Sequence, residues 1–132
     1  MASPEQMTAA VQAYIDAFDR GDAAAAAAIF ADDAVIEDPI GSPPHVGQAA
    51  IQAFYIRAMQ TGAKLTLTSP LRLAPPHLAF SMLVRLNWQD HDMVIDVIET
   101  MEFNPSGKVR RMLAYFGPAN MTDAKTGHQI HA

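Results

Sequence analysis

The stretch from residue 78 to residue 116, LAFSMLVRLNWQDHDMVIDVIETMEFNPSGKVRRMLAYF, decides the fold. Apolar and polar residues alternate along most of its length, which is the period-two pattern of half-buried β-strands. We predict three strands within it, over residues 78–87, 93–103 and 108–116. Turn-forming residues fill positions 104–107 and predict a hairpin between the last two strands. Strands connected in this way predict an antiparallel meander.

The first half of the chain carries helical signals instead. The segment SPEQ at residues 3–6 is typical of a helix start, and apolar residues then recur at helical spacing through Phe18 until Gly21 ends the helix. We predict two more helices, over residues 23–30 and 47–59. Helices followed by an antiparallel meander predict the α+β class, with the helices packed on one face of the sheet.

The remaining segments are less regular. We predict a short strand over residues 35–38 and a longer one over residues 65–73, bent near Pro70 because proline cannot donate to a sheet ladder. The tail from about residue 121 to residue 132 has few apolar anchors, so we expect it to be loosely ordered. Since no repeat or linker interrupts the pattern, residues 1–132 predict a single domain.

Composition excludes several classes of protein. The chain has 132 residues, of which 50% are hydrophobic and 17% charged, which predicts a folded domain with a real core. The formal net charge of −5, without a basic block, argues against a nucleic-acid or membrane-surface partner. The absence of cysteine excludes disulfides and thiolate metal sites. No secretory signal is visible, so we expect a cytoplasmic location.

Glu99 is the most informative polar residue of the predicted sheet. In the strand over residues 93–103 it shares its face with apolar residues only: Met93, Ile95, Val97, Met101 and Phe103. A charged carboxylate is costly on such a face, so the carboxyl must pair with a cation or have a raised pKa and stay neutral. Alternatively, Glu99 lies near the edge of the sheet or pairs with Arg110 on the next strand.

Three further residues are candidates for a site. Asp38 ends a predicted strand and precedes Pro39, which places a carboxylate at a stiff strand end, although a turn aspartate bonding its own backbone has the same pattern. Tyr14 and Tyr55 lie on the apolar faces of their helices, as core tyrosines do. Alternatively, their hydroxyls bond each other, which makes Tyr14 a stronger hydrogen-bond donor.

The other chemical motifs are weak. The five histidines show no metal-ligand spacing and the glycines form no phosphate-binding loop, so we expect no metal site and no cofactor. We expect the apolar residues on the strand faces mainly to form the core, and some of them also to line a ligand cavity. Those expected to line it are Met82, Val84, Leu86, Met101, Met112 and Phe116.

Together these residues resemble the steroid Δ5-isomerases, or ketosteroid isomerases, of the nuclear-transport-factor-2-like superfamily. The resemblance lies in AYI at residues 13–15, FADDAVIEDPIG at 30–41, AFY at 53–55 and the strand around Glu99. It covers residues 3–120. It implies a cone of three N-terminal helices packed on a strongly curved, mixed, mostly antiparallel sheet, and a homodimer built through the sheet.

The resemblance also implies an activity. These enzymes move a steroid double bond from the β,γ to the α,β position of a 3-ketone without a cofactor, and they are themselves a standard example of a tyrosine and a protonated carboxyl forming an oxyanion hole. By position, Asp38 matches the general base, Tyr14 the main oxyanion donor and Tyr55 a supporting tyrosine. Glu99 stands where the family usually has aspartic acid, and it donates only if protonated.

The sequence departs from the family in one more place and leaves other functions open. Some members carry a tyrosine where this chain has Phe30, so a longer tyrosine chain is excluded. A carrier of steroids or other apolar ligands on the same fold is one alternative. An epoxide hydrolase or polyketide cyclase of the superfamily is another, but such hydrolases use an Asp–Arg–Asp set, and Arg85 has the parity that points away from the cavity.

Overall fold

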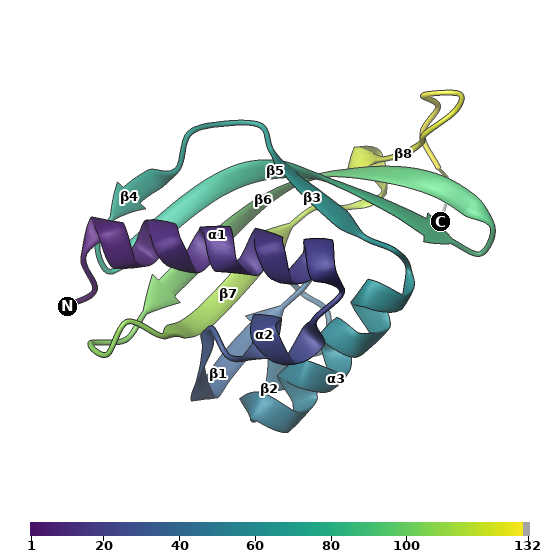
Figure 1. Ribbon diagram of the computed structural model, residues 1–132. Coiled ribbons are helices and arrows are strands. Elements are labelled where there is room, and N and C mark those ends of the chain that lie inside the picture. Colours follow the sequence, from purple (N-terminus) through teal and green to yellow (C-terminus); the bar gives the residue numbers. More distant parts are fainter. Residues whose placement is uncertain (131–132) are drawn as a thin grey trace.

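Three helices lie across one face of a curved sheet in the computed structural model, which describes residues 1–130 (Figure 1). The helices are α1 (Pro4–Arg20), α2 (Ala23–Ala27) and α3 (Gly47–Gln60). Ser3 accepts a hydrogen bond from the backbone of Gln6 and the Gln6 side chain returns one, which closes the start of α1. Gly21 ends α1 at a φ of 65°, a conformation that glycine adopts without strain.

The sheet has eight strands and is mixed. Its main path runs β2-β1-β7-β6-β5-β3, with β4 paired to β5 and β8 paired to β6. The β1–β7 pair is parallel and the others are antiparallel. The strands are β1 (Phe30–Glu37), β2 (His45–Val46), β3 (Lys64–Leu67), β4 (Arg72–Ala74), β5 (His77–Trp88), β6 (His91–Phe103), β7 (Val109–Tyr115) and β8 (Met121–Asp123), with a 3₁₀ turn at Pro118–Asn120 before β8. The α+β class and the mixed, mostly antiparallel sheet are therefore confirmed.

The alternation of side chains along β6 follows the predicted parity. Met93, Val97 and Glu99 are buried, whereas Asp96 and Ile98 on the opposite parity are exposed. The buried parity faces the helices, which cover this side of the sheet (Figure 1). The long β5 and β6 bend along their length, so the covered face is concave (Figure 1).

Two boundaries near α2 differ from the prediction. The helix over residues 23–30 stops at Ala27, because Phe30 begins β1 and pairs with Val109 of β7. The strand over residues 35–38 therefore starts five residues earlier, at Phe30, and ends at Glu37. The alanine run has high helix propensity, but sheet pairing outweighs it at its end.

The predictions for residues 65–73 and for the tail also need correction. The single bent strand is two strands, β3 and β4, which both pair with β5 on either side of Pro70. The tail is not loose at Met121–Asp123, because these residues form β8 and pair with β6. Its last two positions, 131 and 132, lie outside the described residues. Backbone pairing of β8 needed few apolar anchors, which is why composition did not reveal it.

Side chains of the parallel β1–β7 pair are buried in the core, so shortening one of them should destabilise the fold. Ile36 on β1 is fully buried, so Ile36→Ala is expected to lower the free energy of unfolding by about 2–5 kcal/mol, measured by urea denaturation. Ile56→Ala is the matched control, because Ile56 is 45% exposed on α3, and we expect a change within about 0.5 kcal/mol. Equal losses in the two variants would contradict the assigned core.

Candidate functional site

A cavity of about 520 Å³ lies between the concave face of the sheet and the helices. Its volume is within the range of small-molecule sites, and its wall is mostly apolar with a few polar groups. Tyr14, Asp38, Tyr55 and Glu99 all line it, although they come from α1, the end of β1, α3 and β6. The fold thus brings together the four candidate residues that the sequence singled out.

Glu99 reaches the cavity from the middle of the sheet. It is 1% exposed and pairs in register with Phe80 on β5 and Ala114 on β7, both of which are buried. Its Oε2 atom has no hydrogen-bond partner among residues 1–130. The alternatives left open for Glu99 are wrong, because it lies on a central strand and Arg110 instead pairs with Glu102 at 3.2 Å. An unpaired buried oxygen lining a cavity is suited to bind a ligand atom.

Asp38 follows directly on the last residue of β1. Two residues later, the backbone N–H of Ile40 donates to the carbonyl of Ala114 at 2.7 Å. Ala114 is the residue of β7 that stands next to Glu99 in the sheet. The loop that carries Asp38 is therefore fixed near Glu99, and the two carboxyl groups line the same cavity closely enough for the charge of Asp38 to raise the pKa of Glu99. Asp38 is half-buried, in contrast to the fully enclosed Glu99.

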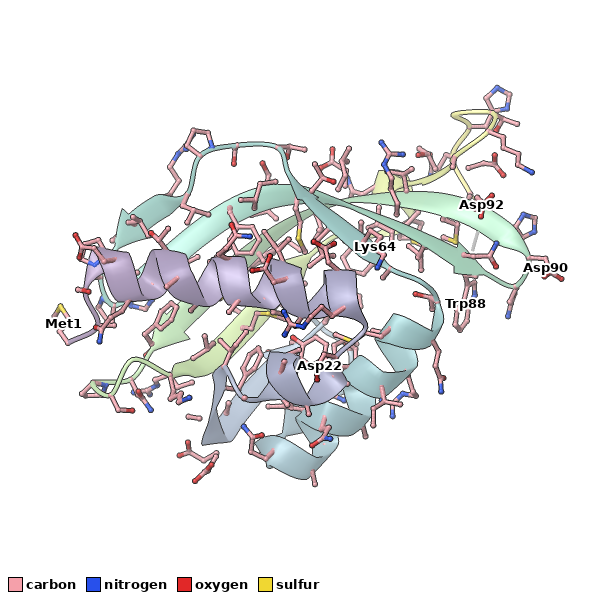
Figure 2. The ribbon with its side chains drawn as sticks, viewed as in Figure 1. Met1, Asp22, Lys64, Trp88, Asp90 and Asp92 are labelled. Carbon is pink, nitrogen blue, oxygen red and sulfur yellow. The ribbon has the colours of Figure 1, made fainter. Side chains whose placement is uncertain are left out.

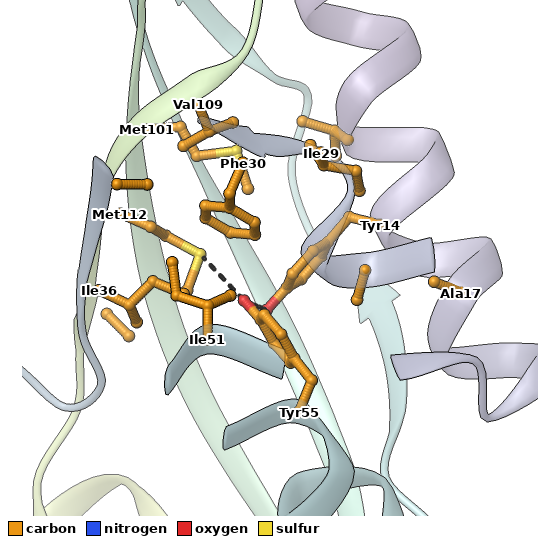
Figure 3. Close-up of a cluster of buried hydrophobic side chains, with 14 of the residues drawn as sticks. Tyr14, Ala17, Ile29, Phe30, Ile36, Ile51, Tyr55, Met101, Val109 and Met112 are labelled. Carbon is orange, nitrogen blue, oxygen red and sulfur yellow. Dashed lines mark hydrogen bonds between the residues drawn. The ribbon is translucent and has the colours of Figure 1, made fainter. Parts of the chain in front are cut away.

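Tyr14 and Tyr55 are bonded to each other. The hydroxyl of Tyr55 donates to the Tyr14 oxygen at 3.2 Å and lies 3.8 Å from the Met112 sulfur (Figure 3). A thioether is a weak acceptor, so the tyrosine oxygen is the better partner for the Tyr55 proton. The hydroxyl hydrogen of Tyr14 is therefore not used by Tyr55 and can be directed toward Glu99 or a ligand in the cavity. The alternative reading of two paired hydroxyls, rather than two independent core tyrosines, is confirmed.

The surroundings shift the pKa values of these groups in one direction. Burial raises the pKa of Asp38 to about 6. Burial, and then the charge of Asp38, raise the pKa of Glu99 well above its usual range, and the Tyr14 hydroxyl opposes this only in part. Burial also raises the pKa of Tyr14 and of Tyr55. These shifts favour the protonated forms of Glu99 and of the two tyrosines, and they place the pKa of Asp38 below neutral pH.

Most of the expected apolar lining residues face the cavity. Met82, Val84, Leu86 and Phe116 line it. Met101 and Met112 are not among its lining residues; both are buried in the core cluster that also holds Phe30 and Tyr55 (Figure 3). Their parity was assigned correctly, but parity gives the face of a strand and not how far along the strand a cavity extends.

Several lining residues were missed. Trp88 and Ile95 lie on the cavity parity of β5 and β6, so extending each pattern toward the hairpin would have found them. Phe18, at the end of the predicted first helix, and Phe54, beside Tyr55 on α3, also line the cavity. Arg57 on α3 also lines it, and no signal in the sequence marks that position.

Residues 1–130 contain no group of three or more histidine, aspartate or glutamate side chains arranged to hold a metal ion. No helix in that range is long and apolar enough to cross a membrane.

The unpaired Oε2 atom of Glu99 should cost stability, as groups held ready for a ligand do. Glu99→Leu removes this buried oxygen, and we expect the free energy of unfolding in urea to rise by about 1–3 kcal/mol at neutral pH. Glu102→Leu is the control, because Glu102 is partly exposed and paired with Arg110, so its removal should change stability by less than about 1 kcal/mol. A loss of stability in Glu99→Leu would contradict the unpaired state.

Comparisons with known proteins agree with this arrangement. A family model described as a SnoaL-like domain matches residues 11–112. A curated steroid Delta-isomerase of Nocardioides simplex is 38% identical over 117 residues, which cover 88% of this chain and 94% of that protein. The epoxide hydrolase/cyclase-like enzyme SalBIII, which takes part in pyran ring formation in salinomycin, has a similar fold with a TM-score of 0.87 and 19% identity, covering 93% of this chain and 99% of that one. The chain therefore belongs to the steroid Δ-isomerase family of SnoaL-like domains, within the nuclear-transport-factor-2-like superfamily.

Proposed function

We propose that this isomerase converts 3-oxo-Δ5-steroids to 3-oxo-Δ4-steroids by moving one proton within the substrate. The observation that carries the proposal is the meeting of Asp38, Tyr14 and Glu99 in one apolar cavity. The name of the curated relative, a steroid Delta-isomerase, supports the class of substrate. Because the same proton leaves and returns, the reaction requires no cofactor and no metal.

Asp38 is the base in this mechanism. Its carboxylate takes a proton from the carbon α to the 3-ketone, the C–H electrons form a dienolate, and the ketone oxygen becomes negatively charged. The protonated Asp38 then returns the proton to the γ carbon, which leaves the double bond in conjugation with the ketone. A pKa of about 6 suits both steps, since the group is ionised near neutral pH yet basic enough to accept a proton.

Tyr14 and Glu99 are the proposed oxyanion hole. Tyr14 donates its free hydroxyl hydrogen, strengthened by the hydrogen bond that it accepts from Tyr55. Glu99 donates the proton that its raised pKa retains. Fixed donors in a site without water stabilise charge that develops on the ketone oxygen far better than water does. The extra methylene of glutamate is accommodated on this backbone, because the Glu99 side chain stays enclosed and lines the cavity.

A non-catalytic carrier is the second candidate, and the position of Asp38 argues against it. An apolar ligand gains nothing from a carboxylate at its reactive end, and the burial of that group costs free energy. Arg85, the arginine considered for the hydrolase or cyclase alternative, is exposed and lies on the opposite parity from Met82 and Val84, which line the cavity. Likeness to SalBIII concerns the fold.

The proposal includes a homodimer formed through the outer face of the sheet. Ile98 and Tyr115 are paired in register on β6 and β7, and both leave large apolar side chains exposed there. Adjacent exposed apolar residues of this size favour an interface. Location in the cytoplasm stays a prediction from the sequence.

The direct test is turnover of 5-androstene-3,17-dione, followed by the new ultraviolet absorbance of the conjugated ketone. Asp38→Asn keeps the shape but removes the base, so we expect kcat to fall by about 10²–10⁴-fold while steroid affinity changes far less. Asp33→Asn, an exposed aspartate of β1, is the control and should retain activity. Wild-type protein that binds the steroid without converting it would favour the carrier.

The role of Glu99 is tested by two substitutions that differ in hydrogen bonding. Glu99→Gln still donates through its amide, whereas Glu99→Ala loses the donor, and we expect Ala to reduce kcat by about 10²–10³-fold and Gln by clearly less. The same absorbance assay measures both variants. If Ala and Gln reduce kcat equally, Glu99 does not act as a donor.

A further inference from the structure

The cavity carries one positive charge on its wall. Among the described residues that line it, Arg57 is the sole lysine or arginine, and the other polar members are Tyr14, Asp38, Tyr55, Thr61 and Glu99. The proposed reaction uses the tyrosines and carboxyls and leaves Arg57 without a role. Since the proposed mechanism assigns the negative charge of the dienolate oxygen to Tyr14 and Glu99, an arginine on the wall of this mostly apolar cavity requires a separate explanation.

Arg57 lies toward the open end of the cavity. It precedes Thr61, the residue that ends α3, by about one helical turn, and both line the cavity. The carbonyl of Thr61 accepts a hydrogen bond from the backbone of Asn87 at 2.9 Å, which joins the end of α3 to the end of β5. Trp88, the next residue, is 53% exposed and lines the opening near the last turn of α3 (Figure 2).

The charge of Arg57 is not neutralised by the protein. Its side chain is exposed and forms no salt bridge within residues 1–130, in contrast to Arg20 and Arg110, which pair with carboxylates. The titratable side chain that responds to it is His45, whose pKa is lowered by burial and by the nearby guanidinium. Tyr14 and Glu99 are buried, whereas Arg57 is exposed although it lines the same cavity, so the guanidinium lies nearer the opening than the proposed oxyanion hole does.

We propose that Arg57 determines specificity by binding a carboxylate on the ring-D side chain of the steroid, so that acidic steroids are preferred substrates. This inference rests on the proposed function, because the ketone end must lie at Tyr14, Asp38 and Glu99. The far end of the rigid ring system then extends toward the opening, where the guanidinium lies. A planar guanidinium is suited to bind a carboxylate through two parallel hydrogen bonds.

Charge also fixes the orientation of such a substrate. Asp38 is negatively charged near neutral pH, so it repels a substrate carboxylate from the catalytic end of the cavity. Arg57 attracts the same group at the other end. The two side chains therefore favour the single orientation in which the ketone meets the oxyanion hole, whereas a neutral steroid is oriented by shape alone.

The test compares a 3-oxo-Δ5-steroid acid, with its carboxyl on the ring-D side chain, with the methyl ester of the same acid. The readout is the ratio of kcat/KM for the acid to kcat/KM for the ester. Arg57→Met keeps the length of the side chain without its charge, and we expect it to lower this ratio about tenfold, the value of one charge-assisted hydrogen bond. Arg57→Lys should recover part of the ratio, and Arg20→Met, which changes a distant arginine paired with Asp22, should leave it as in the wild type.

The outcomes separate the two proposals. A ratio that is the same in the wild type and in Arg57→Met overturns the specificity role while turnover of the ester still supports the isomerase. If neither steroid is isomerised, the proposed reaction fails, and the quenching of Trp88, the one tryptophan of the chain, then measures binding of acid and ester directly. Equal binding of the acid by the wild type and by Arg57→Met would again overturn the inference.

Discussion

The cost of burying charge governs this structure. Three ionisable groups, Tyr14, Asp38 and Glu99, line one apolar cavity, and the cavity cannot hold all of them in charged form. Burial raises the pKa of each, and the charge of Asp38 raises the pKa of Glu99 further. The shifts favour protonated Tyr14 and Glu99 beside a carboxyl at Asp38 that ionises below neutral pH. In the proposed mechanism, this environment makes one base and two donors out of two carboxyls and a phenol.

The sheet produces this difference between two carboxyls that are close in space. Glu99 lies on a central strand, enclosed by neighbours on β5 and β7, so it is fully desolvated. Asp38 lies just beyond the end of β1 and is only half-buried. The hydrogen bond from Ile40 to Ala114 fixes the distance between them through the backbone. One residue of displacement along either strand would place its side chain on the opposite face and remove the site.

Sequence patterns predicted the parts of the site that depend on local periodicity. The parity of β6 placed Glu99 on the apolar face, and the helical spacing of α1 placed Tyr14 there as well. They did not predict what depends on contacts between distant segments. The end of α2 was overestimated because pairing of Phe30 with Val109 was not visible, and β8 was missed for the same reason. The depth of the cavity, which excludes Met101 and Met112 and includes Arg57, follows from sheet curvature, which one sequence does not specify.

The most direct test of the protonation states is a titration of the protein with ¹³C-labelled aspartate and glutamate carboxyls, followed by NMR from about pH 4 to about pH 9. Asp38→Asn and Glu99→Gln serve to assign the two signals. We predict that the Asp38 signal titrates with a midpoint of about 6, whereas the Glu99 signal keeps the chemical shift of a neutral acid through neutral pH. A Glu99 carboxyl that ionises before Asp38 would contradict the account.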